Sequence, residues 1–139
     1  MSPHPRIRAV LATGVLALGL SLAAPAEAQE VCSGTGPRQP DPDGLLRPTT
    51  YCRNLGGYVG PPASFGTGYL HEGRNWFVCQ QEFPGLGGPE VGDLRSDWWL
   101  WTQGDVAYSD DGRGWFPATK IIGSTSDEPV PGVPMCRAE

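Results

Sequence analysis

The chain has 139 residues and a formal net charge of −5, with 20 glycines, 15 prolines and four cysteines. This acidic balance lacks the basic patch that nucleic acids and anionic surfaces require, so nucleic acid is excluded as a partner. The length suits one domain. Short apolar runs separated by glycine and proline predict strands and turns rather than long helices.

An export signal is predicted at the start of the chain. Two arginines precede an uncharged apolar run over residues 9–24, which is too short for a membrane span. An A-x-A motif that ends at Ala28 is typical of signal peptidase cleavage. We therefore expect residues 1–28 to be removed, although an uncleaved anchor is the alternative. The secreted, extracellular product would start at Gln29, carry a net charge near −6 and have no membrane attachment.

Four cysteines lie in the exported part, and an even count in a short secreted chain is typical of disulfides. Three pairings are possible. We favour one disulfide that closes the N-terminal segment and one that ties the tail to a strand, Cys32–Cys52 and Cys79–Cys136. Zinc is the alternative, but the chain has no C-x-x-C pair and its mature part has one histidine, His71. We therefore expect no metal and no cofactor.

The first half of the mature chain is expected to contain few strands. Residues 29–56 are rich in glycine and proline and are interpreted as an irregular N-terminal segment, with a short strand within residues 51–59. Alternating β-formers predict strands over residues 75–81 and 97–102. The intervening residues 83–92 hold a turn-rich loop.

The second half is expected to form a hairpin, a turn and a tail. The S-D-D-G sequence that ends at Gly112 predicts a hairpin turn, and residues 114–116 form the returning strand. Pro117 suits the first position of a single helical turn, because its ring fixes φ. Residues 121–122 are expected to form a last short strand. The Pro-rich tail, residues 124–139, would be extended and held by its cysteine.

This succession resembles an SH3-like (Src-homology 3-like) domain, as found in small secreted proteins of actinobacteria. The shared features are a tryptophan pair, a glycine, and a G-x-x-P run followed by a small turn and a β-branched residue. Here these features are Trp98-Trp99, Gly112, Gly114–Pro117 and Ile121. The resemblance covers residues 57–123. It implies an all-β fold, a small antiparallel barrel of about five strands with irregular, disulfide-tied termini.

The resemblance also implies a ligand-binding surface. Peptide-binding SH3 domains place a tyrosine three residues after the proline, where this chain has Lys120, so binding of proline motifs is not carried over. The first tryptophan of the pair faces the ligand in the family. We therefore expect Trp98, Pro117 and Tyr108 to form the site. Trp99 should lie in the core, because alternate strand residues face opposite sides and a small barrel buries only one. The alternative is that the tryptophans only shield the sheet.

The expected function is non-catalytic binding of a cell-wall peptide or glycan by a monomer. Catalysis finds little support in the residues, because His71 is the only histidine base and no G-x-S-x-G motif is present. Asp110 and Asp111 are interpreted as turn residues rather than as a catalytic pair or a calcium loop. A small secreted hydrolase, or an inhibitor that presents the loop at residues 83–92, is the alternative function.

Overall fold

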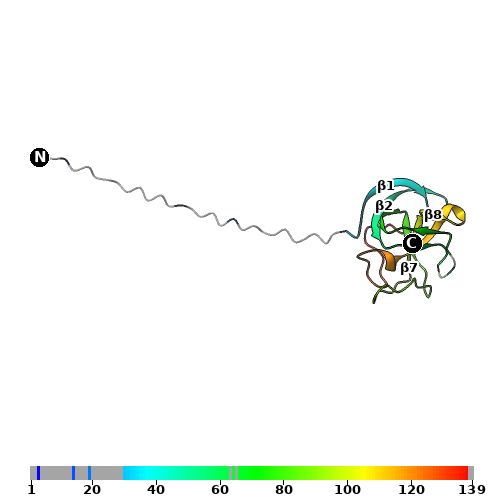
Figure 1. Ribbon diagram of the computed structural model, residues 1–139. Helices are drawn as coiled ribbons and strands as arrows, with labels where there is room; N and C mark the ends of the chain where they lie inside the picture. The colour runs from blue at the N-terminus through cyan, green and yellow to red at the C-terminus, as the bar shows by residue number, and fades with distance from the viewer. Residues whose placement is uncertain are drawn as a thin grey trace.

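The computed structural model describes residues 3, 14 and 19, residues 30–62, residue 64 and residues 66–137. Apart from those three isolated positions, the expected signal peptide lies outside the described residues. Figure 1 shows that the chain from residue 30 onward folds into strands and loops with little helix. No helix in this part of the chain has the length and apolar character that a membrane crossing requires.

The strands form three antiparallel sheets of three strands each within the described chain (Figure 1). In spatial order, the first sheet holds β1 (Cys32–Pro40), β2 (Leu46–Asn54) and β5 (Gly73–Phe77). The second sheet holds β3 (Gly57–Val59), β4 (Gly68–Leu70) and β8 (Val106–Ala107). The third sheet holds β6 (Cys79–Glu82), β7 (Trp98–Gln103) and β9 (Arg113–Pro117).

Short backbone links join the three sheets. Val78 separates β5 from β6, and its N–H donates to the carbonyl of Trp101 at 2.9 Å, so one bent segment serves the first and third sheets. Gly60 and Trp115 exchange two hydrogen bonds of 2.9 Å, which join the second sheet to the third. The all-β expectation is confirmed. The expectation of a small barrel of about five strands is wrong, because the described strands form three separate sheets, which these short links connect.

The expectation of an irregular N-terminal segment is also wrong. Residues 32–54 form the β1–β2 hairpin, in which Cys32 lies opposite Cys52. β1 is an edge strand with two register shifts, and edge strands and bulges tolerate proline and glycine. Pro48 precedes Thr50, where pairing of β2 with β5 begins, so the missing N–H costs no bond to β5.

The hydrophobic core lies between the sheets. Phe77 and Phe116 form its centre, are fully buried and have ring centroids 5.8 Å apart. Trp98 packs against this core and is partly buried. The other buried members come from all three sheets, the turn after β9 and the tail: Cys32, Cys52, Val59, Leu70, Leu100, Ala118, Ile121, Val130 and Val133.

Two 3-10 turns frame β9. The first, η1 (Asp110–Gly112), occupies the expected hairpin turn, and all three of its residues have positive φ. The second, η2 (Ala118–Lys120), is the single helical turn expected after Pro117, and this expectation is confirmed. The strand expected at residues 121–122 is reduced to one bridge between Ile121 and Asn54.

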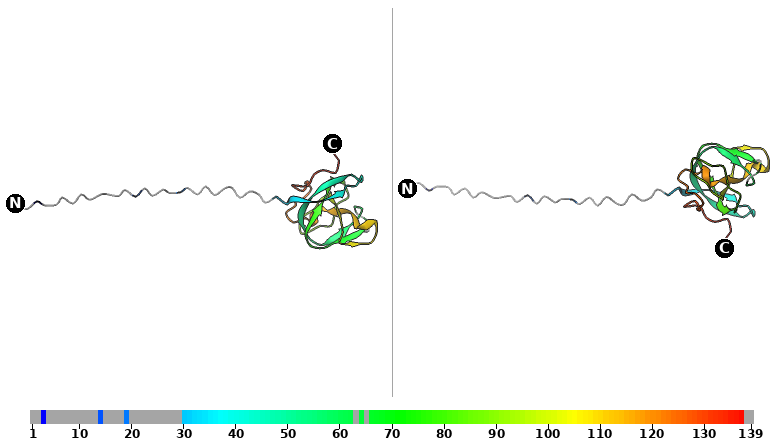
Figure 2. Two further views of the ribbon diagram at one scale, coloured as in Figure 1. Left: turned by 90° about the horizontal axis from the view of Figure 1, so that it is seen from above. Right: turned by 90° about the horizontal axis from the view of Figure 1, so that it is seen from below.

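The C-terminal tail docks against the free edge of β6, and both expected disulfides, Cys32–Cys52 and Cys79–Cys136, are present. The buried amide of Gln80 binds the tail: its Nε2 donates to the carbonyls of Val130 and Val133 at 2.8 Å, and its Oε1 accepts from the N–H of Val130 at 2.7 Å. Figure 2 shows the tail beside the start of β1. The cysteine is therefore not the sole anchor of the tail.

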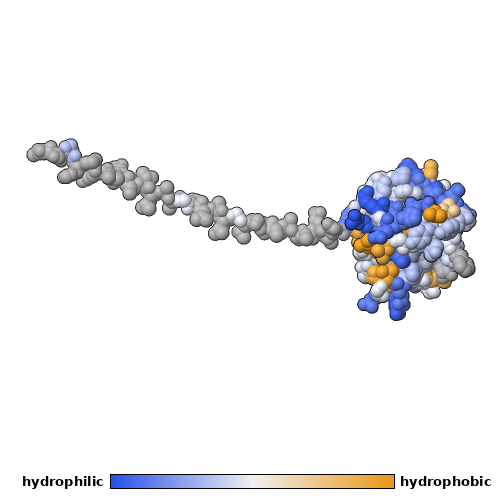
Figure 3. All heavy atoms as spheres, viewed as in Figure 1, coloured by the Kyte–Doolittle hydropathy of each residue, from blue (hydrophilic) through white to orange (hydrophobic). Residues whose placement is uncertain are grey.

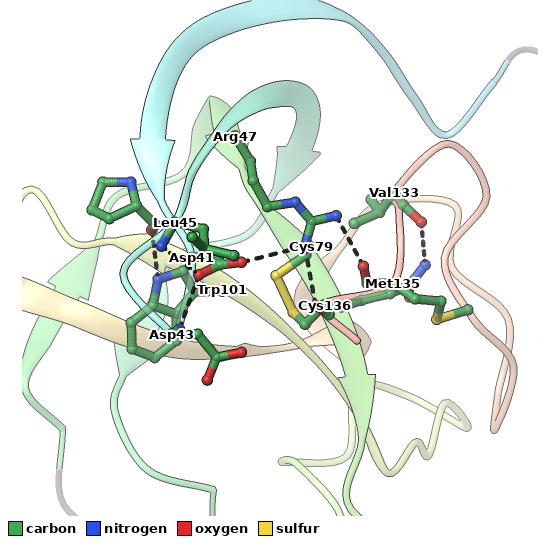
Figure 4. The surroundings of a disulfide bond; sticks show 11 residues. Asp41, Asp43, Leu45, Arg47, Cys79, Trp101, Val133, Met135 and Cys136 are labelled. Atoms are coloured by element: carbon green, nitrogen blue, oxygen red, sulfur yellow. Dashed lines mark hydrogen bonds and ion pairs between the residues drawn. A yellow bond between two sulfur atoms is a disulfide. The ribbon is translucent and has the colours of Figure 1, made fainter. Parts of the chain in front are cut away.

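A polar cluster connects the β1–β2 turn to the chain beside the Cys79–Cys136 disulfide (Figure 4). The buried carboxylate of Asp41 accepts the N–H groups of Asp43 and Leu45, each at 2.9 Å, and lies 3.7 Å from the guanidinium of Arg47. Arg47 in turn donates to the carbonyls of Met135 and Cys136 at 3.0 and 3.2 Å. The β1–β2 hairpin and the C-terminal tail therefore stabilise each other.

Candidate functional site

The two faces of β7 are reversed relative to the expectation. Trp98 and Leu100 share one face, and Leu100 is fully buried in the core against which Trp98 packs. Trp99 and Trp101 occupy the opposite face, as strand alternation requires. The sequence could have indicated that Trp98 faces the core, because Leu100 lies two residues later on the same face and an aliphatic residue between tryptophans favours the core side. The expectation that Trp98 faces outward is therefore wrong.

Trp99 is buried as expected, with 5% of its surface exposed, but a loop rather than the core covers it. Its indole Nε1–H donates to the carbonyl of Leu86 at 2.8 Å. A Cβ added at Gly88 would lie 2.6 Å from Pro117 and 3.6 Å from the Trp99 ring, so the loop touches both. The loop over residues 83–92 is thus docked on the third sheet and not presented as an isolated inhibitor loop.

A first cavity of about 410 Å³ opens beside this loop. Tyr58 of β3 and Tyr69 of β4 form one side, with ring centroids 5.2 Å apart in an edge-to-face arrangement. Trp99, Trp115 and Pro117 form the other side. Most of the remaining lining is glycine and proline from the loops after β3 and β6, together with Lys120 of η2: Gly56, Gly57, Val59, Gly60, Pro61, Ser64, Gly66, Gly87, Gly88, Pro89 and Lys120.

A second cavity of about 480 Å³ adjoins the first. The two share Pro61 and Trp115, so we treat them together as one groove across the third sheet. Trp101 and Trp115, which lie opposite each other on β7 and β9, pack edge to face at 5.1 Å. Polar residues are prominent in the remaining lining of the second cavity: Pro62, Thr67, Asp110, Asp111, Arg113 and Gly114.

The structure brings one of the three expected ligand-binding residues to the groove. Pro117 lines the first cavity, whereas Tyr108 is 60% exposed and lines neither cavity. Trp98 lies on the core side. Sequence reasoning missed Tyr58, which lines the first cavity and is 65% exposed. Only its position in a short Gly-flanked strand hints at that location, because the contact with β9 is not local.

The chemistry of the first cavity is that of an aromatic and apolar binding surface. Among its described lining residues there is no histidine, cysteine or carboxylate, and Lys120 is the one charged residue. His71 is exposed, as expected, and its backbone N–H donates to the carboxylate of Asp105 at 2.7 Å. No group of three or more potential metal ligands lies together within the described part of the chain.

Exposed apolar side chains are scattered rather than joined into one large patch on the visible face. Figure 3 shows a mostly hydrophilic surface with separate hydrophobic areas. Among the described residues, Leu45 and Leu46 at the β1–β2 turn are the most exposed leucines, at 65% and 62%. Small exposed areas of this kind are ordinary on folded domains, so the groove remains the candidate site.

No family model matches the chain, and neither the curated proteins nor the solved structures contain a significant match to it.

Proposed function

We propose that the chain is an exported, non-catalytic binding module that holds an extended polymer of the cell envelope, a peptide or a glycan, in the groove. The observation that carries the proposal is the junction of the two cavities at Trp115 and Pro61. Because they adjoin, successive units of one chain can occupy both. A polymer therefore fits the groove better than a single small ligand does.

The lining of the groove supports recognition of rings. Tyrosine and tryptophan combine a large apolar surface with few rotatable bonds, so they contact proline or sugar rings at a modest entropic cost. Tyr58 is 65% exposed, which leaves most of its ring free for a ligand. Trp115 is held edge to face against Phe83 at 4.9 Å and against Trp101 at 5.1 Å. The aromatic surface is therefore largely fixed before a ligand binds.

Export and the SH3-like relationship belong to the same proposal. Two disulfides suit an oxidising, extracellular environment, and the predicted cleavage after Ala28 would deliver the domain there. The order of the bent β5–β6 segment, β7, the η1 turn, β9 and η2 supports the proposed SH3-like relationship. The groove lies over the G-x-x-P run that suggested this family, because Trp115 and Pro117 belong to it.

The test is retention of the mature domain on insoluble peptidoglycan, chitin and cellulose. We expect at least one polymer to retain the wild type and Tyr58→Ala to weaken that binding about fivefold, as loss of an aromatic contact worth about 1 kcal/mol would do. Tyr58 is exposed, so its removal should change the free energy of unfolding by no more than about 0.5 kcal/mol.

Tyr108→Ala is the matched control. Tyr108 is as exposed as Tyr58 but lies outside both cavities, so this variant should bind like the wild type. Equal binding by both tyrosine variants would remove the groove as the site. Failure of all three polymers to retain the wild type would contradict the cell-envelope assignment.

A further inference from the structure

The second cavity differs from the first in its charge. Asp110 and Asp111 of the η1 turn are among its lining residues. Both residues are exposed, and neither side chain forms a hydrogen bond or an ion pair with a described residue. Their negative charge is therefore available to a ligand that occupies the cavity.

Arg113 adds an unused donor to the same cavity. Its Nη2 donates to Oε1 of Gln39 at 3.0 Å. Its Nη1 is buried and has no hydrogen-bond partner among the described residues. A buried donor without an acceptor is costly, so an acceptor atom of a ligand would stabilise the complex if the guanidinium turned to expose Nη1 to the cavity.

The tryptophans give the cavity a fixed apolar wall. The indole Nε1–H of Trp101 donates to the carbonyl of Pro40 at 3.1 Å, which fixes the orientation of this ring (Figure 4). Trp115 packs against it at 69°. Tryptophan is the side chain that attracts a cation most strongly through its ring face. Asp110 and Asp111 outnumber the one cation of the lining, Arg113, so the wall and the carboxylates together favour a ligand that is positively charged.

We propose that the second cavity binds a pyranose ring that carries a primary ammonium group, an amino sugar without an N-acetyl group. The inference rests on the proposed function, since this ring would be one unit of the bound polymer. The ammonium group would face Asp110 and Asp111, and a hydroxyl oxygen would accept from Arg113. A lysine residue separates its cation from its nearest acceptor, the backbone carbonyl, by a flexible side chain, whereas an N-acetylated sugar supplies acceptors but no cation.

The experiment compares three probes on the mature domain by isothermal titration calorimetry: a glucosamine hexamer, an N-acetylglucosamine hexamer and hexalysine. The pH is kept below the pKa of the sugar amine, so the glucosamine probe is charged. We expect the glucosamine hexamer to bind about fivefold to tenfold more tightly than the acetylated hexamer, and hexalysine to bind more weakly than the glucosamine hexamer. The preference should shrink at high salt, because exposed charges are screened.

The variant for this test is Asp110→Asn/Asp111→Asn. Asparagine accepts positive φ at least as well as aspartate, so the φ values of 51° and 55° at these positions are retained. Affinity for the glucosamine hexamer should fall about fivefold to tenfold, as two partly exposed ion pairs would predict. Asp93→Asn/Asp127→Asn is the charge-matched control, since both residues are exposed, Asp127 has a φ of 56°, and neither lines the groove.

The outcomes separate this inference from the proposed function. Equal affinity for the two sugar hexamers, or an unchanged affinity in Asp110→Asn/Asp111→Asn, overturns the inference. Tighter binding of hexalysine overturns the choice of a sugar. If Tyr58→Ala still weakens retention on insoluble polymer in those cases, the proposed function stands alone. If only the aspartate variant weakens binding, the second cavity is supported and the extended groove is not.

Discussion

The buried amide of Gln80 offers the sharpest test of how the tail is held. Gln80 is 1% exposed, and its side chain satisfies three backbone groups of the tail, the N–H and carbonyl of Val130 and the carbonyl of Val133. The substitution Gln80→Met keeps the length of the side chain and removes its donor and acceptor atoms. The carbonyl of Val130 would keep the N–H of Val133 as a donor at 3.3 Å, whereas the N–H of Val130 and the carbonyl of Val133 would lie buried without a partner.

The expected loss of stability follows from these contacts. A buried backbone group without a partner costs about 2 kcal/mol, so two such groups cost about 4 kcal/mol. Burial of the apolar methionine side chain offsets about 2 kcal/mol of this. We therefore expect Gln80→Met to lower the free energy of unfolding by about 2 kcal/mol, a substantial share of the stability of a small domain.

Urea denaturation with both disulfides intact measures this loss, followed by tryptophan fluorescence. The control is Gln81→Met, because Gln81 is only partly buried and its side chain makes no hydrogen bond to a described residue; its loss should stay within about 0.5 kcal/mol. Amide hydrogen exchange should show loss of protection at Val130 in Gln80→Met alone. A Gln80→Met loss below about 1 kcal/mol would refute the reasoning.

Three further predictions concern stability. Serine substitutions at Cys79 and Cys136 should cost about 4 kcal/mol in urea, against about 3 kcal/mol for the other disulfide, because the sequence separations are 57 and 20 residues; equal losses would contradict this entropic account. Asp41→Ala should lower the free energy of unfolding by about 2 kcal/mol, since two N–H groups lose their acceptor, whereas the exposed Asp43 should tolerate alanine in the same thermal scan. Trp98→Ala should cost about 3 kcal/mol, as a large-to-small change against a core does, and should leave polymer binding intact in the folded fraction; lost binding at unchanged stability would restore Trp98 as the ligand-facing residue.

The features that the sequence predicted correctly are those that local chemistry determines. Pro117 fixes its own φ, and a single helical turn follows it. The S-D-D-G sequence places a tight turn at Gly112, where positive φ is needed. Both disulfide pairings were also predicted, Cys32–Cys52 as the closure of the N-terminal segment and Cys79–Cys136 as the tie between the tail and a strand.

The features that the sequence did not reveal depend on contacts between distant segments. The glycines and prolines of residues 32–54 predict irregular chain. The β1–β2 hairpin forms there nevertheless, because the Cys32–Cys52 disulfide and the pairing with β5 stabilise it. The burial of Trp99 was expected, but its cover was not, because the carbonyl of Leu86 that accepts its indole N–H comes from a loop. The position of Tyr58 in the groove likewise depends on the link between Gly60 and Trp115.

The docking of the tail on β6 has a consequence for the order in which the chain can fold. β6 is an edge strand, and its backbone partners at Gln80 are the carbonyl of Pro134 and the N–H of Cys136. While a chain emerges from the ribosome or a membrane channel N-terminus first, those partners arrive last, so this edge stays open until nearly the whole domain is available. A chain that ends before Val130 would keep the edge open permanently, and an unpaired strand edge invites pairing with other chains. A protease cut before Val130 would instead leave the tail attached through the Cys79–Cys136 disulfide, so clipping is expected to cause self-association only after that disulfide is reduced.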